Sequence, residues 1–169
     1  TDLRGCKLSA TLAAAPADTI FNNSYTAPGE FDVDLTLNPT KVLTGRALKD
    51  KEFTFEMVRV GASEDFIGTV KNELNGNIPF GALSYTQADI GKSYDYEIRE
   101  LVPTPAEVGM AYDPMVLAFK VNVTDLGGGK LSATLAATPA DTIFNNIYTA
   151  TGEFDVDLTL NPTKVLTGR

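Results

Sequence analysis

Three polar residues of the sequence stand where an alternating strand pattern would place apolar side chains. Lys41 has an odd residue number, like the apolar residues at positions 31, 33, 35 and 37 before it, and so continues their alternation. Glu100 follows Ile98 by two positions, and Asn146 follows Phe144 by two. Because successive side chains of a strand point to opposite faces, we expect all three to point into the interior.

Buried together, a lysine, a glutamate and an asparagine have two possible outcomes. An isolated charge or amide in the interior is costly, so the three are expected to form one cluster. The first outcome is a salt bridge between Lys41 and Glu100, with Asn146 as a hydrogen-bonding neighbour. The second is covalent, because desolvation lowers the pKa of a lysine and raises that of a carboxylic acid. Strand parity leaves both outcomes open.

The covalent outcome is a Lys–Asn isopeptide bond, formed once and not turned over. A neutral Lys41 amine is a nucleophile that can attack the side-chain carbonyl of Asn146. Protonated Glu100 would polarise that carbonyl by a hydrogen bond and then pass a proton to the departing ammonia. Glu100 is therefore the candidate catalytic residue, and Lys41 and Asn146 are the candidate cross-linked pair.

The segments around these residues alternate between apolar and polar positions, as half-buried β-strands do. The clearest are residues 31–37, 53–57, 94–98 and 115–123. Turn sequences lie at 75–76 (Asn-Gly) and 127–129 (Gly-Gly-Gly), where we expect hairpins. No segment has a convincing helical periodicity. The pattern predicts an all-β fold, an antiparallel β-sandwich of immunoglobulin-like type.

The sequence also contains a long internal repeat. Residues 1–46 recur almost unchanged as 124–169, an offset of 123 positions (124 − 1) with only five differences. This period is the size of a domain and far exceeds the 20–50 residues of a solenoid unit. It predicts that 1–29 are the C-terminal strands of a preceding repeat, 30–152 a complete repeat and 153–169 the first strand of the next. An internal duplication within one irregular domain is the alternative.

The offset gives the two flanking segments their own copies of the reactive residues. Asn23 corresponds to Asn146 (146 − 23 = 123), and Lys164 to Lys41 (164 − 41 = 123). Each lacks the middle strands and the glutamate of its own repeat. We expect Asn23 and Lys164 to be unreacted with each other.

Composition excludes several classes of function. The net charge of −8 disfavours nucleic acid and anionic membranes as partners. No apolar run is long enough for membrane insertion. With no histidine and the single cysteine Cys6, histidine-based catalytic triads and Cys/His zinc sites are not expected. Asp32 and Asp34 are expected on a solvated strand face, without a calcium-binding loop. We expect no metal, no cofactor and no turnover enzyme.

Four stretches carry a family resemblance. They are TKVLTGRALKDKEFTFEM (40–57), NGNIPFGALSYTQADIGKSYDYEIRE (75–100), AYD (111–113) and FNNIY (144–148). In this order they resemble the streptococcal pilin isopeptide linkage domain of the T-antigen backbone pilin type, over roughly residues 33–149. The resemblance implies an immunoglobulin-like sandwich with an intramolecular isopeptide cross-link, present here as a tandem repeat of a Gram-positive surface protein.

The family motifs select the same three residues as strand parity. The family's reactive lysine lies in a K-x-L-x-G segment, which is 41–45 here. Its catalytic glutamate ends a Y-x-Y-x-I-x-E strand, here 94–100, and its asparagine lies in F-x-N-x-Y, here 144–148. The resemblance therefore implies the roles of Lys41, Glu100 and Asn146 that were inferred above from the chemistry.

The resemblance implies a structural role outside the cell. The expected function is a repeat of a bacterial surface fibre, either a pilus shaft or an adhesin stalk, located on the cell wall or in a pilus. Its expected partners are adjacent identical repeats or further copies that assemble into the fibre. The alternative is an adhesive binding module whose loops contact a host protein or glycan.

Overall fold

The structure of the chain is a computed structural model that describes residues 24, 26, 28–61, 64–150, 152, 163–165 and 167–168. Asn23 and most of the two flanking segments lie outside these residues. The predicted division into three repeats is therefore still a prediction.

The regular secondary structure of the described residues is almost entirely β-strand. The strands are β1 (Gly29–Asp32), β2 (Thr40–Thr44), β3 (Thr54–Val60), β4 (Asp65–Lys71), β5 (Ala82–Tyr85), β6 (Ser93–Leu101), β7 (Met110–Ala111), β8 (Val116–Gly127), β9 (Lys130–Leu135) and β10 (Ile143–Tyr148). The helices are the short α1 (Val33–Leu37) and the 3₁₀ turn η1 (Gln87–Asp89). The all-β prediction is confirmed.

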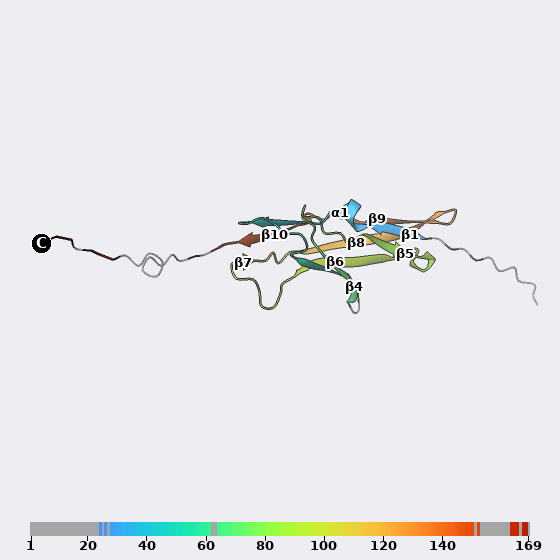
Figure 1. The fold of residues 1–169 in the computed structure, drawn as a ribbon. Coiled ribbons are helices and arrows are strands. Elements are labelled where there is room, and N and C mark those ends of the chain that lie inside the picture. Colours follow the sequence, from blue (N-terminus) through green and yellow to red (C-terminus); the bar gives the residue numbers. More distant parts are fainter. Residues whose placement is uncertain are drawn as a thin grey trace, which may run out of the picture.

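The strands form three sheets in two layers (Figure 1). The largest has the order β4-β3-β6-β8-β9, the second β2-β10-β7, and the third pairs β1 with β5. The first half of β8 pairs with β6 and its second half with β9, so β8 carries the large sheet from one layer to the other. The first strand, β1, and the last, β10, lie toward opposite ends of this sandwich (Figure 1).

One strand pair departs from the antiparallel expectation. β10 runs parallel to β2, with Phe144 opposite Lys41 and Asn146 opposite Leu43. The other pairs among the described strands are antiparallel. Parallel neighbours need a long connection between them. Here that connection is the body of the sandwich, so strands from the two ends of the domain's sequence lie side by side.

The core is built from the predicted inward positions of three segments. Phe53, Phe55 and Met57 are buried, and so are Tyr96 and Ile98. In β8 every second residue is buried, from Leu117 through Phe119 and Val121 to Val123. Rings from different strands meet there, for example Phe31 with Phe119, whose centroids are 6.0 Å apart.

The prediction of one continuous strand over 31–37 is wrong. β1 ends at Asp32, whose carboxylate caps α1 by accepting a hydrogen bond from Leu35 N (2.9 Å). Asn38 ends the helix in the left-handed conformation (φ 48°). Capping by Asp and a left-handed Asn stabilise a helical turn here, although the alternation suggested a strand. Leu35 consequently is 85% exposed instead of buried.

The expectation that Asp32 and Asp34 lie on a solvated strand face is also wrong. Asp32 is the helix cap, and the Asp34 carboxylate accepts hydrogen bonds from Phe80 N (2.8 Å) and Gly81 N (3.0 Å). Asp34 thus ties α1 to the segment before β5. Among the described residues there is no group of three or more potential metal ligands of the His, Cys, Asp or Glu type.

The two predicted hairpin turns differ in outcome. The glycines at 127–129 join β8 to its antiparallel neighbour β9, as predicted. The Asn75-Gly76 turn connects β4 and β5, which lie in different sheets. It packs instead on β2, where Lys41 N donates to Gly76 O (2.6 Å). Within the described part of the chain, no helix is long and apolar enough to span a membrane.

Gly76 is expected to be intolerant of a side chain. Its φ is +91°, and a Cβ at this position would lie 2.5 Å from Lys41 O. We expect Gly76→Ala to lower the free energy of unfolding by at least about 1–2 kcal/mol, the cost of the left-handed backbone alone. Urea unfolding measures the loss. Gly68→Ala in β4 is the matched control, because a Cβ there meets nothing within 4 Å. Equal losses in the two variants would contradict the prediction.

Candidate functional site

Lys41, Glu100 and Asn146 come from three strands and meet inside the sandwich. Lys41 lies on β2 and Asn146 on β10, which are parallel neighbours in one sheet. Glu100 lies near the end of β6, in the other sheet, opposite Phe55 of β3. The structure therefore brings the three residues together across the two layers.

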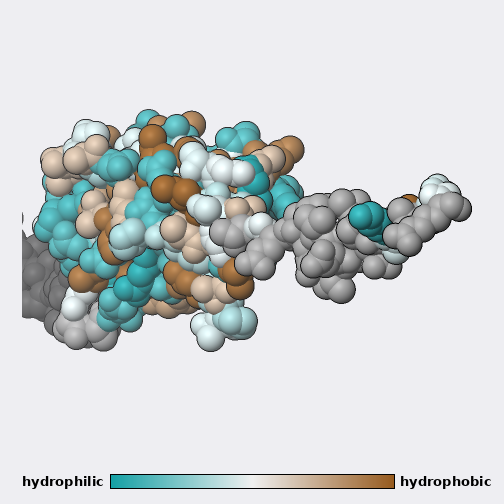
Figure 2. All heavy atoms as spheres, turned by 90° about the vertical axis from the view of Figure 1, so that its left-hand side faces the viewer, coloured by the Kyte–Doolittle hydropathy of each residue, from teal (hydrophilic) through white to brown (hydrophobic). Residues whose placement is uncertain are grey.

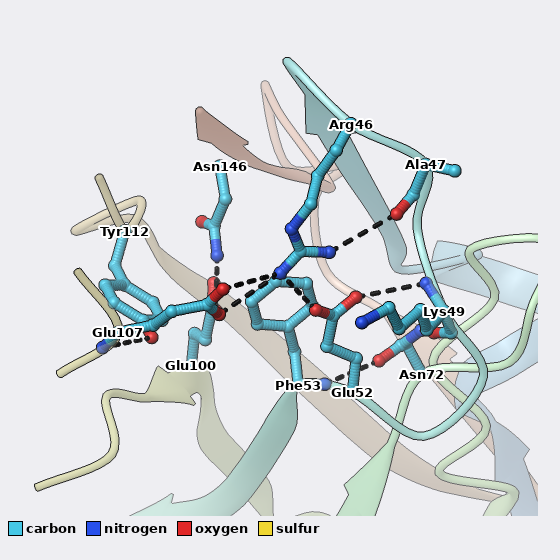
Figure 3. Close-up of polar contacts among 10 residues, drawn as sticks. All are labelled: Arg46, Ala47, Lys49, Glu52, Phe53, Asn72, Glu100, Glu107, Tyr112 and Asn146. Atoms are coloured by element: carbon cyan, nitrogen blue, oxygen red, sulfur yellow. Dashed lines mark hydrogen bonds and ion pairs between the residues drawn. The ribbon is translucent and has the colours of Figure 1, made fainter. Parts of the chain in front are cut away.

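The Glu100 carboxylate bridges the other two side chains. Its Oε2 accepts a hydrogen bond from Lys41 Nζ at 2.7 Å, and its Oε1 accepts one from Asn146 Nδ2, also at 2.7 Å. The Lys41 and Glu100 side chains are 0% and 1% exposed, and Asn146 is fully buried. Figure 3 shows the Asn146 amide directed at Glu100. A lysine amine and a side-chain amide are thus held at the two oxygens of one carboxylate.

The carbonyl end of the Asn146 amide is held by a residue to which the sequence analysis gave no role. Asp113 N donates to Asn146 Oδ1 at 2.9 Å. The Asp113 carboxylate accepts from Asn145 N (2.7 Å) and from Met115 N (2.9 Å), which fixes the Asp113 loop against β10. The only sequence signal for Asp113 was its position within the AYD motif. Every residue except proline has a backbone N–H, so the residue type does not indicate which N–H holds the amide.

This arrangement corrects one expected contact. Glu100 was expected to polarise the Asn146 carbonyl, but its carboxylate faces the amide nitrogen. The carbonyl oxygen faces the backbone N–H of Asp113 instead. The two hydrogen bonds fix the orientation of the amide, since a carboxylate must face NH₂ and an N–H donor must face the oxygen.

Aromatic rings surround the lysine amine. Lys41 Nζ lies 4.7 Å from the ring centroid of Phe53 and 6.0 Å from that of Phe55. The Phe55 ring also contacts Phe144, with centroids 5.1 Å apart. Burial lowers the pKa of the Lys41 amine from its ordinary value of 10.5, and the hydrogen bond and charge of Glu100 act in the opposite direction. The site therefore favours the neutral, nucleophilic amine more than water does.

A charged network ties together the loops beside this cluster. Arg46 Nη2 lies 3.1 Å from both carboxylate oxygens of Glu107, and it also pairs with Glu52 (Figure 3). The Arg46 guanidinium stacks over the Tyr148 ring, 4.9 Å from its centroid. Buried Asn72 holds the loop before β3 by accepting from Phe53 N (2.7 Å) and donating to Lys49 O (2.8 Å). These contacts fix the ends of β2, β3 and β10 around the site.

Of the two flanking candidates, Lys164 does not join this cluster. Lys164 is exposed, in a segment without regular secondary structure. Asn23 lies outside the described residues. The buried site therefore consists of Lys41, Glu100 and Asn146, with Phe53 as a neighbour that parity placed inward and Asp113 as one that parity did not identify.

The site lies within a domain that matches a known family. The family model described as FctA, Spy0128-like isopeptide containing domain, matches residues 37–149. The match covers 113 of the 169 residues (149 − 37 + 1) and includes all three residues of the site. The chain belongs to this family. A domain of this pilin type is a fibre-forming structural domain of extracellular or surface-associated proteins. Comparison with curated proteins gave no match.

The lowered pKa of Lys41 predicts how stability depends on pH in a protein that cannot cross-link. Asn146→Ala removes the amide and leaves Lys41 next to Glu100. Between the lowered folded-state pKa and 10.5, the unfolded chain binds more protons at Lys41 than the folded chain. The free energy of unfolding should therefore rise with pH through this window, by at most about 1.4 kcal/mol per pH unit, and level off above 10.5.

The control for this measurement is the double variant Lys41→Met/Asn146→Ala. Burial raises the pKa of Tyr85, Tyr94 and Tyr96, so these groups reduce stability at high pH in both proteins. The difference between the two proteins, measured by urea unfolding with far-UV circular dichroism, removes the tyrosine contribution and leaves that of the Lys41–Glu100 pair. Parallel stability curves would show that Lys41 has no lowered pKa.

Proposed function

We propose that the domain is a force-carrying repeat of an extracellular fibre, locked by an isopeptide bond between Lys41 Nζ and Asn146 Cγ. The observation that carries this proposal is the bridging carboxylate of Glu100. It lies 2.7 Å from the attacking nitrogen and 2.7 Å from the nitrogen that must leave. Membership of the isopeptide-containing family supports the same chemistry.

The reaction balances without any external reagent. Neutral Lys41 attacks Asn146 Cγ, and the carbonyl electron pair moves onto Oδ1. Oε2 of Glu100 takes the proton that Nζ loses, and the carboxyl group gives a proton to Nδ2 from Oε1. The Cγ–Nδ2 bond then breaks, ammonia leaves, and Glu100 returns to its starting state. One amide bond is lost and one is formed.

Asp113 supplies the remaining group that the reaction needs. Negative charge develops on Asn146 Oδ1 in the tetrahedral intermediate, and the N–H of Asp113 already points at this oxygen from 2.9 Å. A fixed donor in a site closed to water stabilises such a charge strongly. Glu100 thus transfers the proton, and Asp113 N–H stabilises the oxyanion.

The fold supports a mechanical role for the bond. Tension that enters at β1 and leaves after β10 pulls parallel β2 and β10 past each other, because the chain enters and leaves at opposite ends of the domain (Figure 1). A bond from Lys41 to Asn146 joins these two strands directly. Without it, the 104 residues between them (42–145) could extend by roughly 350 Å at about 3.3–3.6 Å each.

The bond would also stabilise the domain at rest. Closing a loop of about 100 residues lowers the entropy of the unfolded chain and stabilises a fold by roughly 4.7 kcal/mol in the estimate made for disulfides. An amide is not broken by thiols, in contrast to a disulfide. The near-identical repeat at an offset of 123 residues supports a tandem array in which each repeat carries its own bond.

Intact mass tests the bond. We expect the purified chain to be lighter than its sequence by one ammonia, and Lys41→Ala and Glu100→Gln to restore the full mass. Glu97→Gln is the matched control, because Glu97 lies on the same strand without contacting the cluster and its substitution should leave the deficit unchanged. A single deficit that Lys41→Ala abolishes also means that Asn23 and Lys164 have not reacted with each other. Full theoretical mass for the unmodified chain would refute the bond.

Asp113→Ala tests the oxyanion donor. The substitution removes the two hydrogen bonds that fix the loop, so we expect bond formation to slow by a factor on the order of 10². Chains recovered unlinked from inclusion bodies can be refolded, with ammonia loss followed by mass and folding followed by tyrosine fluorescence. Folding should finish while linking lags. Linking at the unmodified rate would contradict a role for Asp113.

A further inference from the structure

Each end of the domain carries an apolar feature next to the point where the chain passes to a neighbouring repeat. At the β1 end, Pro28, Gly29, Leu126 and Leu131 line an open hollow of roughly 370 Å³, and the Leu126 side chain is 67% exposed. At the β10 end, Val108 is 90% exposed. Figure 2, which views the end to the left in Figure 1, shows hydrophobic residues scattered among polar ones.

The chain between consecutive repeats is very short. Thr149, directly after β10, is tied to its own domain, since Thr149 N donates to Gly109 O at 2.8 Å. At the other end Pro28 O accepts from Leu131 N at 3.2 Å. The offset of 123 residues makes Thr151 the counterpart of Pro28 (151 − 28). Only Ala150 therefore separates Thr149 from Thr151, and the Cα atoms of these two residues lie at most about 7.6 Å apart.

This short connection brings the two apolar features together. Val108 precedes Gly109, the residue whose carbonyl holds Thr149. The hollow adjoins Pro28, the counterpart of Thr151. We propose that Val108 of each repeat packs into the hollow of the following repeat, against Leu126 and Leu131, and so forms a rigid joint. This proposal rests on the tandem array of the proposed function.

The chemistry of the two surfaces suits this contact. Gly29 lines the hollow and packs closely on Leu131, since a Cβ on Gly29 would lie 2.6 Å from the Leu131 Cβ. Lys130 and Glu30 both line the hollow, so its rim carries one charge of each sign around the apolar contact. The contact is far smaller than a stable interface between separate proteins. It can form because a one-residue tether gives a high effective concentration and leaves little chain entropy to lose.

Distance measurements between two repeats test the joint. The chain is extended with residues 47–152, which completes the repeat that begins at 153. Cys6→Gly, the residue of its own copy, removes the native thiol, and Ala88→Cys in each complete repeat takes a spin label at an exposed position. Electron–electron double resonance then gives the distribution of distances between the labels. We expect one narrow distribution, and a distribution at least twice as wide after insertion of Gly-Ser-Gly-Ser behind Ala150.

Paired variants locate the contact. Val108→Ser in the first repeat or Leu126→Ser in the second should broaden the distribution, and both together should broaden it no further than either alone. Val108→Ser in the second repeat and Leu126→Ser in the first lie at the outer ends of the pair, away from the joint. They should leave the distance distribution narrow. An unmodified protein as broad as the insertion variant, or equal effects from both placements, would overturn the joint. Intact mass of the same samples judges the isopeptide bond separately, since a linked protein lacks two ammonia molecules whatever the joint does.

Discussion

The buried amine of Lys41 is the constraint on which the surrounding structure depends. A lysine inside a core loses its hydration, and only a hydrogen-bonded carboxylate at close range offsets much of that loss. Glu100 supplies it from the opposite sheet, and its second oxygen then needs a donor, which is the Asn146 amide. The Asn146 carbonyl needs a donor in turn, and Asp113 provides it. Each group is satisfied only if the next is present.

The same constraint connects the chemistry to the mechanics. Lys41 and Asn146 can share one carboxylate because β2 and β10 are parallel neighbours. That pairing is also the one that tension along the chain would shear. The proposed covalent bond would therefore lie across the strand pair that would bear the load. The short connection between repeats, with its apolar hollow and Val108, would pass the load from one domain to the next with little bending.

Strand parity predicted the inward direction of all three site residues correctly, but for different reasons. Glu100 and Asn146 lie in uninterrupted strands, β6 and β10, where alternation is a direct consequence of backbone geometry. For Lys41 the assumed strand does not exist, because α1 interrupts it at Val33–Leu37. Lys41 still faces inward because β2 begins again at Thr40 and packs on β10. The helix was missed because Asp32, Asp34 and Asn38 stabilise it through caps and a contact to residues 80–81 that lie far away in sequence.

The sequence by itself determined the strand-rich class of the fold, the inward faces of most core segments, and the inward direction of Lys41, Glu100 and Asn146. These follow from local rules, since side-chain alternation and the cost of burying a charge act along one strand at a time. Only the tertiary structure decided that β2 and β10 are parallel and that Glu100 faces the amide nitrogen. It also showed that a backbone N–H of Asp113 holds the carbonyl. Those features depend on how distant segments meet, and no residue pattern specifies the direction of a hydrogen bond between them.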